Sequence, residues 1–528
     1  MVFLISGVSL LSAFAYFCFG RKLFAIFQQC GYSPRTFFKS LGNECKPEIE
    51  RLSTYSLTFF IYSLVFSPLF AYFSALYVVV LFLGALAFFF VVFIKNKPIK
   101  EVRLTARFVR MTVVSVLIFV GTIAAVTFSW GEFVGFDLRI CLVVSAIISA
   151  ACLMLPAYIG IGSLILLPYD RFLYGKSIKA CKKRLAEFPS LIKIGITGSY
   201  GKTSVKNILE KMLSTKYKVV ATPLSYNTPL GICKAAKDVD KTTEIFIAEV
   251  GARNIGDIKE LCEIVKPDVG IITGICGQHL ETFLSVENVK RAKNELIEAL
   301  PIDGYAFFSS DSKGSEELFE KCSVTKFLAG ASGGEVSLKS FREEESGAFL
   351  EIQTGGKTYS FRTELRGRAN ASNICLAAAV ALKMGITPER IVVAAERLKP
   401  SPHRLEVLRA NGIIVIDDSY NANIESVKAA AEVLKCFGGR KFTVTPGIVE
   451  AGESSQKTNV EAGKILSFAA DEIVAVGANY EAIVSGAERR CCVTEVKNLE
   501  EAKEILAKKV KAGDVVLFLN DIPDRYGS

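Results

Sequence analysis

The feature that most constrains the fold is a short apolar run followed directly by a glycine-rich turn. Residues 191–196 are mostly apolar and predict a short buried strand, and a helical pattern begins near Ser204. Between them lies the run TGSYGKTS, residues 197–204. Glycines let backbone N–H groups close around phosphate groups, and a helix N-terminus adds the positive end of its dipole. This order of strand, turn and helix predicts a phosphate-binding loop, and we expect it to bind ATP.

The spacing of the turn predicts what its side chains do. Lys202 is expected to reach the β- and γ-phosphates of ATP, and the hydroxyl of Thr203 to bind Mg²⁺. The longer pattern G-x-x-x-x-G-K-[ST] is not met, because it requires glycine at the position of Ile196. The loop residues expected to contact ATP are Gly198, Ser199, Tyr200, Gly201, Lys202, Thr203 and Ser204.

The apolar residues are concentrated before residue 170. The chain has 528 residues, of which 51% are hydrophobic, a larger share than is usual for a soluble protein. Apolar stretches lie at residues 2–19, 55–94, 112–130 and 140–156, and the second is roughly twice the ~20 residues that one span needs. We therefore predict an α-helical membrane region of about five spans at residues 1–170. The 14 cysteines show no paired spacing, so we expect neither disulfides nor a zinc site.

The distribution of charge predicts the orientation of these spans. The loops after the first and third spans, and the segment after the fifth, are rich in lysine and arginine, whereas residues 131–139 contain only one basic residue. Positive loops favour the cytoplasm, so we expect a multi-pass protein of the cell membrane whose remaining domains are cytoplasmic. The net charge of +10 follows this distribution and indicates no nucleic acid partner. No ionisable residue lies in the middle of a predicted span, which favours an anchor over a transporter.

Beyond the phosphate loop, short β-branched runs alternate with helical patterns, which predicts a doubly wound α/β domain at residues 188–398. Glu249 ends one such run, where a carboxylate can hold Mg²⁺ opposite Thr203; the alternative is a surface acid at a strand end. His279 comes a few residues after another run, and a lone histidine is more often structural than a ligand. Lys293 lies on an amphipathic helix, where a solvated face is the default.

From about residue 190 to its end, the chain resembles the Mur ligases, and most closely the branch that adds D-alanyl-D-alanine to a cell-wall precursor. In that family the acid at the position of Glu249 binds Mg²⁺, and the histidine of a His-Leu-Glu motif reaches a second Mg²⁺. A lysine on the next helix is carbamylated in several members. The resemblance therefore implies catalytic and metal-site roles for Glu249, His279 and Lys293, with Lys293 a candidate for carbamylation.

The resemblance also implies residues for the carboxylate substrate. Residues 225–231 take the place of the family's Asn-Asn-x-x-Gly stretch near the reacting carboxylate. Thr228 stands where the second asparagine is usual, so only Asn227 is carried over as a substrate residue.

A second stretch is implied to bind the nucleotide base. The run GRANASN at residues 367–373 resembles a family motif with two asparagines, although Ala369 replaces the usual histidine. Asn370 and Asn373 are expected to contact adenine, because an amide side chain can match both donor and acceptor edges. The alternative for Asn370 is that it caps the following helix.

Two nearby prolines, at positions 400 and 402, indicate a linker and a further domain at residues 399–528, which we expect to be a Rossmann-like α/β unit. Arg404 matches a family arginine that closes on the ATP phosphates, and the guanidinium fork suits that role. The run DDSYNAN at residues 417–423 is the sharpest link to the D-alanyl-D-alanine branch. By resemblance Asp418 contacts the nucleotide, while Tyr420 and Asn421 shape the site for the incoming amine.

Together these features predict an ATP-dependent, ADP-forming carboxylate–amine ligase of peptidoglycan precursor synthesis. The expected substrates are D-alanyl-D-alanine and a muramoyl-tripeptide acceptor that is either UDP-linked or lipid-linked, because membrane spans stand where the family has its UDP-binding domain. Two stretches depart from the family pattern: Ile424 stands where a proline is usual, and residues 518–523 stand where Lys-Gly-Ser is usual after the last strand. The alternatives are a membrane-bound γ-polyglutamate synthase and, from another class, an ATP-driven transporter or non-catalytic regulator.

Overall fold

The structure, a computed structural model, describes residues 16, 18, 20–43, 46–65, 83, 87, 90–92, 102, 104–134, 150–151, 153–276, 283–419, 422–449 and 455–519. The chain divides into two compact units, whose boundary lies between Leu173 and Tyr174. This boundary falls inside helix α8 (Leu155–Ala186), which contains Pro168 within its length. The apolar residues after position 156 therefore continue the same helix.

The described part of the first unit is mainly helical, and its core is rich in aromatic side chains. Besides α8, the described residues include helices α2 (Pro34–Asn43), α3 (Lys46–Val65) and α6 (Ala106–Val134), and residues 20–29 are also helical. Among the described residues, one helical segment, Ala106–Ala125, is long and apolar enough to cross a membrane, with a mean hydropathy of 2.1 and 28% of it buried. Most of residues 2–19, 66–94 and 135–149 lie outside the described residues, so the other predicted spans stay predictions.

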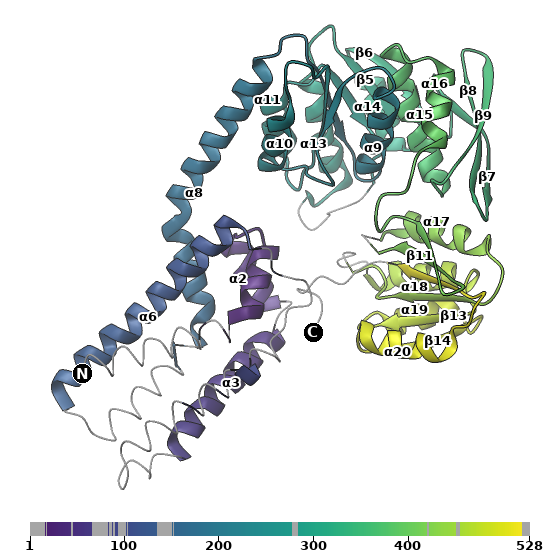
Figure 1. Ribbon diagram of the computed structural model, residues 1–528. Coiled ribbons are helices and arrows are strands. Elements are labelled where there is room, and N and C mark those ends of the chain that lie inside the picture. The colour runs from purple at the N-terminus through teal and green to yellow at the C-terminus, as the bar shows by residue number, and fades with distance from the viewer. Residues whose placement is uncertain are drawn as a thin grey trace. The chain divides into compact units, whose positions relative to one another are not determined.

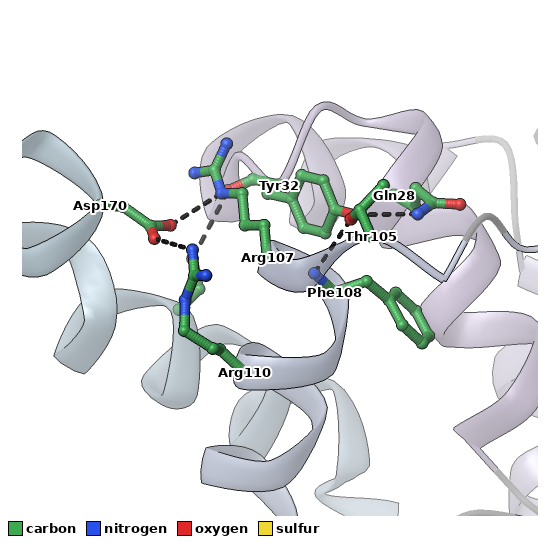
Figure 2. Close-up of polar contacts among 8 residues, drawn as sticks. Gln28, Tyr32, Thr105, Arg107, Phe108, Arg110 and Asp170 are labelled. Atoms are coloured by element: carbon green, nitrogen blue, oxygen red, sulfur yellow. Dashed lines mark hydrogen bonds and ion pairs between the residues drawn. The ribbon is translucent and has the colours of Figure 1, made fainter. Parts of the chain in front are cut away.

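A polar cluster joins α6 to α8 at the point where the apolar stretch of each helix meets charged residues (Figure 2). Asp170 accepts hydrogen bonds from Nε of Arg107 at 2.7 Å and from a terminal nitrogen of Arg110 at 3.1 Å. The guanidinium of Arg107 also lies over the ring of Tyr32, 4.7 Å from its centroid. One carboxylate therefore holds two guanidinium groups, and the cluster keeps a net positive charge.

The second unit begins with a six-stranded parallel sheet (Figure 1). Its spatial order is β2-β3-β1-β4-β5-β6. The strands are β1 (Ile192–Thr197), β2 (Val219–Ala221), β3 (Ile245–Glu249), β4 (Val269–Ile272), β5 (Tyr305–Ser309) and β6 (Thr325–Ala329). Strands on either side of β1 are reached by connections that run in opposite directions, so β1 ends at the switch point of the sheet. The predicted doubly wound domain is confirmed.

Successive residues of a strand point to opposite sides of the sheet, and helices cover both of these sides. In β3, Ile245 and Ile247 enter one core while Phe246 and Ala248 enter another. The first core lies under α9 and α15, which pack against each other, and the second lies under α10 and α11. The helices are α9 (Lys202–Leu213), α10 (Pro229–Ala235), α11 (Asp257–Val265), α13 (Val286–Glu298), α14 (Lys313–Lys321), α15 (Arg368–Lys383) and α16 (Pro388–Glu396).

Two further sheets complete the unit. An antiparallel three-stranded sheet consists of β7 (Ser337–Glu344), β8 (Gly347–Thr354) and β9 (Lys357–Thr363). The last sheet has the order β10-β11-β15-β12-β13-β14, and all its pairs are parallel except the β10–β11 hairpin. Its strands are β10 (Glu406–Ala410), β11 (Ile413–Asp418), β12 (Lys441–Thr445), β13 (Glu472–Val476), β14 (Cys492–Val496) and β15 (Val515–Leu519). Its helices are α17 (Ile424–Lys435), α18 (Ser455–Ser467), α19 (Tyr480–Ala487) and α20 (Leu499–Lys509). This is the α/β unit predicted for the C-terminal part.

Candidate functional site

The glycine-rich loop connects the C-terminal end of β1 to α9, which begins at Lys202, slightly earlier than predicted. Gly201 has a φ of 78°, a conformation that favours glycine. A Cβ atom there would also lie 2.8 Å from Oδ1 of Asn373. A Cβ at Gly198 would collide with the hydroxyl of Thr273, just beyond β4. Both glycines are therefore required by close approach, and Asn373 lies directly beside the loop.

Lys202 lies within this loop. Its Nζ donates hydrogen bonds to the carbonyl oxygens of Gly198 at 2.7 Å and Ser199 at 3.3 Å. Burial lowers the pKa of Lys202, the carboxylate of Glu249 opposes this, and the positive charge of Arg404 lowers the pKa further. Arg404 thus lies within electrostatic range of Lys202, and its role at the ATP phosphates stays a prediction.

Glu249 and Thr203 meet at the carboxyl edge of the sheet. Glu249 ends β3, the neighbour of β1, and the hydroxyl of Thr203 donates a hydrogen bond to its Oε2 at 2.9 Å. The amide of Asn227 donates to Oε1 at 3.4 Å. Glu249 is 1% exposed, so the alternative of a surface acid is wrong. A carboxylate and a hydroxyl that converge on one point are oxygen ligands of the kind Mg²⁺ prefers, so these residues fit that ion.

A second lysine of α9, which the sequence analysis missed, also contacts Glu249. Nζ of Lys206 lies 3.7 Å from Oε2, and both side chains are 1% exposed. Burial lowers the pKa of Lys206, and the negative charge of Glu249 opposes this. Helical spacing could have indicated this residue, because Lys206 follows Lys202 by four positions and so lies on the same face of the helix.

Lys293 on α13 is buried, with 3% exposure, and does not lie on a solvated face. Burial lowers its pKa to about 7, and the positive charge of Lys202 contributes to the shift. At neutral pH a large fraction of this amine is therefore unprotonated. Only a neutral amine is nucleophilic, so this environment suits a lysine that reacts with CO₂.

Asn370 and Asn373 lie on α15, three residues apart, and their side chains touch. Nδ2 of Asn373 donates to Oδ1 of Asn370 at 3.3 Å, and Nδ2 of Asn370 donates to the carbonyl of Arg366 at 2.8 Å. The N-cap of α15 is Gly367. Asn370 is therefore not the helix cap that was considered as its alternative.

Asp418 closes β11 and is 8% exposed. Burial raises its pKa to about 7, and a hydrogen bond from the backbone N–H of Leu405, together with the nearby charge of Arg404, opposes this. Asp418 and Arg404 are therefore near each other.

The structure describes some of the remaining predicted residues, and others lie outside its described part. Tyr200 packs against Gly274, since a Cβ at that glycine would collide with the tyrosine ring. Ser204 lies in the first turn of α9. Thr228, which stands where the family has a second asparagine, is the N-cap of α10 and accepts a hydrogen bond from the N–H of Gly231. His279, Tyr420 and Asn421 lie outside the described residues.

The comparison with protein families agrees with this geometry. Residues 196–381 match the Mur ligase middle domain, and residues 403–519 match the Mur ligase glutamate ligase domain. The described phosphate loop, Glu249, Lys293 and both asparagines lie in the first match, and Arg404 and Asp418 lie in the second.

Individual proteins are similar over more than half of this chain. The UDP-N-acetylmuramoyl-tripeptide–D-alanyl-D-alanine ligase of Mycobacterium leprae is 30% identical over 372 residues, which cover 62% of this chain and 70% of that protein. The ligase of the same name from Bacillus subtilis is 28% identical over 332 residues, 62% of this chain and 72% of that protein.

Among solved structures, MurF from Acinetobacter baumannii has a TM-score of 0.62 and 27% identity, covering 67% of this chain and 78% of that one. MurF from Thermotoga maritima in complex with ADP has a TM-score of 0.59 and 28% identity, covering 66% and 80%.

Proposed function

Because this chain belongs to the Mur ligase family, we propose that it joins D-alanyl-D-alanine to the tripeptide of a muramoyl-peptide acceptor. It is an ATP-dependent carboxylate–amine ligase, as its relatives are. The observation that carries the proposal is the convergence of Lys202, Thr203 and Glu249 at the carboxyl ends of the neighbouring strands β1 and β3. Proteins named for this reaction are among those to which the chain is similar.

The proposed reaction has two steps. An oxygen of the acceptor carboxylate attacks the γ-phosphorus of ATP, ADP leaves, and an acyl phosphate forms. The amino nitrogen of D-alanyl-D-alanine then attacks the acyl carbon, phosphate leaves, and the nitrogen loses a proton to give the amide. Lys202 neutralises charge on the phosphates during the first step, and Arg404 acts on the same charge from the C-terminal domain.

The metal and the remaining site residues have supporting roles. Thr203 and Glu249 would hold Mg²⁺, with His279 at a second Mg²⁺; when bound, the metal offsets negative charge on the transferring phosphoryl group. Lys293, with its pKa near 7, is the proposed site of carbamylation. Asn227 orients the acceptor carboxylate, and Tyr420 and Asn421 the amine. Asn370, Asn373 and Asp418 bind the nucleotide.

We further propose that residues 1–170 form a multi-pass membrane region that places the domains at residues 188–398 and 399–528 in the cytoplasm. The apolar segment Ala106–Ala125 supports one span. The cluster around Asp170 lies where the apolar parts of α6 and α8 end, and arginine and tyrosine are typical of a membrane interface (Figure 2). A membrane location suits a lipid-linked acceptor as well as a UDP-linked one.

The test is ADP release by the detergent-solubilised chain with D-alanyl-D-alanine and either the UDP-linked or the lipid-linked tripeptide. Lys202→Ala is expected to lower turnover at least about 100-fold, because it removes a charge that stabilises the transferring phosphate. Lys211→Ala, an exposed lysine of the same helix, is the matched control and should keep wild-type turnover.

The acceptor that supports turnover identifies the carrier. ADP release that depends on glutamate, and on neither tripeptide, would contradict the proposal and indicate a polyglutamate synthase.

A further inference from the structure

Lys206 is a buried lysine to which the reaction scheme gives no role. Its Nζ donates hydrogen bonds to the carbonyl oxygens of Thr222, at 2.6 Å, and of Leu224, and it also lies 3.7 Å from Oε2 of Glu249. An ammonium group has three donors and no acceptor. Two of these donors therefore bind carbonyl oxygens of the loop, and the carboxylate forms an ion pair with the same ammonium group.

The two carbonyl groups belong to the loop between β2 and α10, the loop that carries Asn227. Leu224 has a φ of 49°, a left-handed conformation that costs a leucine on the order of 1–3 kcal/mol and persists only where other contacts hold it. The same loop contacts Glu249 twice. The N–H of Glu249 donates to the hydroxyl of Thr222 at 3.1 Å, and the amide of Asn227 donates to the Glu249 carboxylate.

A lysine at this position is costly unless it has a specific task. Burying an ammonium group is unfavourable, and an apolar side chain of similar length would fill the space. An apolar side chain, however, would leave both loop carbonyl groups without this donor. The Lys206 ammonium group therefore stabilises the loop as well as the carboxylate of Glu249.

We propose that Lys206 is a positioning residue that fixes the loop of residues 222–227 against Glu249, so that binding of the acceptor depends on a lysine that does not touch it. This inference rests on the proposed function, in which Asn227 lies beside the acceptor carboxylate. Lys206 thereby links the acceptor site to the ATP site, because it lies on the same helix as the phosphate-binding Lys202.

The test compares Lys206→Met with Lys211→Met. Methionine keeps an unbranched stem and removes the ammonium group, and Lys211 is an exposed lysine of the same helix. In Lys206→Met the KM for the acceptor is expected to rise about tenfold or more, as expected for the loss of hydrogen bonds to a charged donor, while the KM for ATP changes less than about twofold. Amide hydrogen exchange of residues 222–228, measured without substrates, is expected to become faster. Lys211→Met should change neither quantity.

Two results would overturn the inference. One is wild-type exchange in the loop of Lys206→Met; the other is an equal rise in both KM values, which would indicate general support of the fold. If Lys206→Met does not fold, Lys206→Gln retains amide donors without the charge, and its acceptor KM should rise by a smaller factor. A wild-type chain that converts neither tripeptide would refute the proposed function, whereas the exchange measurement would still decide the role of Lys206.

Discussion

Glu249 and Asp170, two of the carboxylates that contact cationic side chains, differ in their access to solvent. Glu249 and Lys206 are both 1% exposed, whereas Asp170 is 15% exposed and its partners Arg107 and Arg110 are 40% and 33% exposed. In the buried cluster every donor and acceptor must find a partner within the protein, so the cluster determines where the loop and the phosphate-binding helix lie. The more exposed cluster joins two helices without such a constraint. An ion pair therefore constrains the positions of neighbouring segments when it is buried, and the number of cations in it matters less.

The largest expected effect is that of Glu249→Gln. The substitution leaves the Lys206 ammonium buried without its negative partner, and we expect the free energy of unfolding of the second unit to fall by about 3–5 kcal/mol. The measurement is proteolysis of the full chain at increasing urea concentrations, in which cleavage within residues 174–521 reports unfolding of the second unit. Glu396→Gln, an exposed residue of α16, is the control. Equal loss in both variants would show that the buried pair contributes no more than a surface carboxylate.

Asp418 sharpens the comparison, because it is a buried carboxyl group whose folded-state pKa is raised to about 7. In the unfolded chain an aspartate has a pKa of about 3.9. Between about pH 4 and pH 7 the folded chain therefore binds more protons at this position than the unfolded chain, and stability falls as pH rises. The slope is at most about 1.4 kcal/mol per pH unit.

Asp418→Asn should remove this contribution, which a series of urea unfolding curves between pH 4 and pH 7 would measure. An identical pH dependence in the variant and the wild type would show that Asp418 ionises normally in the folded chain.

Asp170→Asn has the smallest expected effect. Both arginines remain partly exposed, so loss of the carboxylate should lower stability by less than about 1 kcal/mol. Thermal unfolding of the full chain in detergent, compared with Arg171→Gln as an exposed neighbour, is the measurement. A loss of stability as large as that of Glu249→Gln would contradict the comparison and show that the two clusters are equally constrained.

The predictions from sequence succeeded where a local rule applied. The predicted order of strand, glycine-rich turn and helix is that of β1, the loop and α9, and Glu249 lies at the end of β3 as predicted; the binding of phosphate and Mg²⁺ there stays a prediction. Two local defaults failed. Asn370 does not cap its helix, because Gly367 begins it, and Lys293 is buried although its helix is amphipathic. The burial of Lys293 depends on neighbours from other parts of the chain.

The sequence by itself determined the alternation of strands and helices, the glycine-rich loop between a strand and a helix, and the family, because periodicity, the steric freedom of glycine and motif spacing act over a few residues. Tertiary structure alone decided which groups share the buried cluster. Thr203 meets a carboxylate 46 residues away, and Lys206 meets a carbonyl group 16 residues away. It also set the shifted pKa values of Lys293 and Asp418, because the cost of burying a charge depends on all the atoms packed around it.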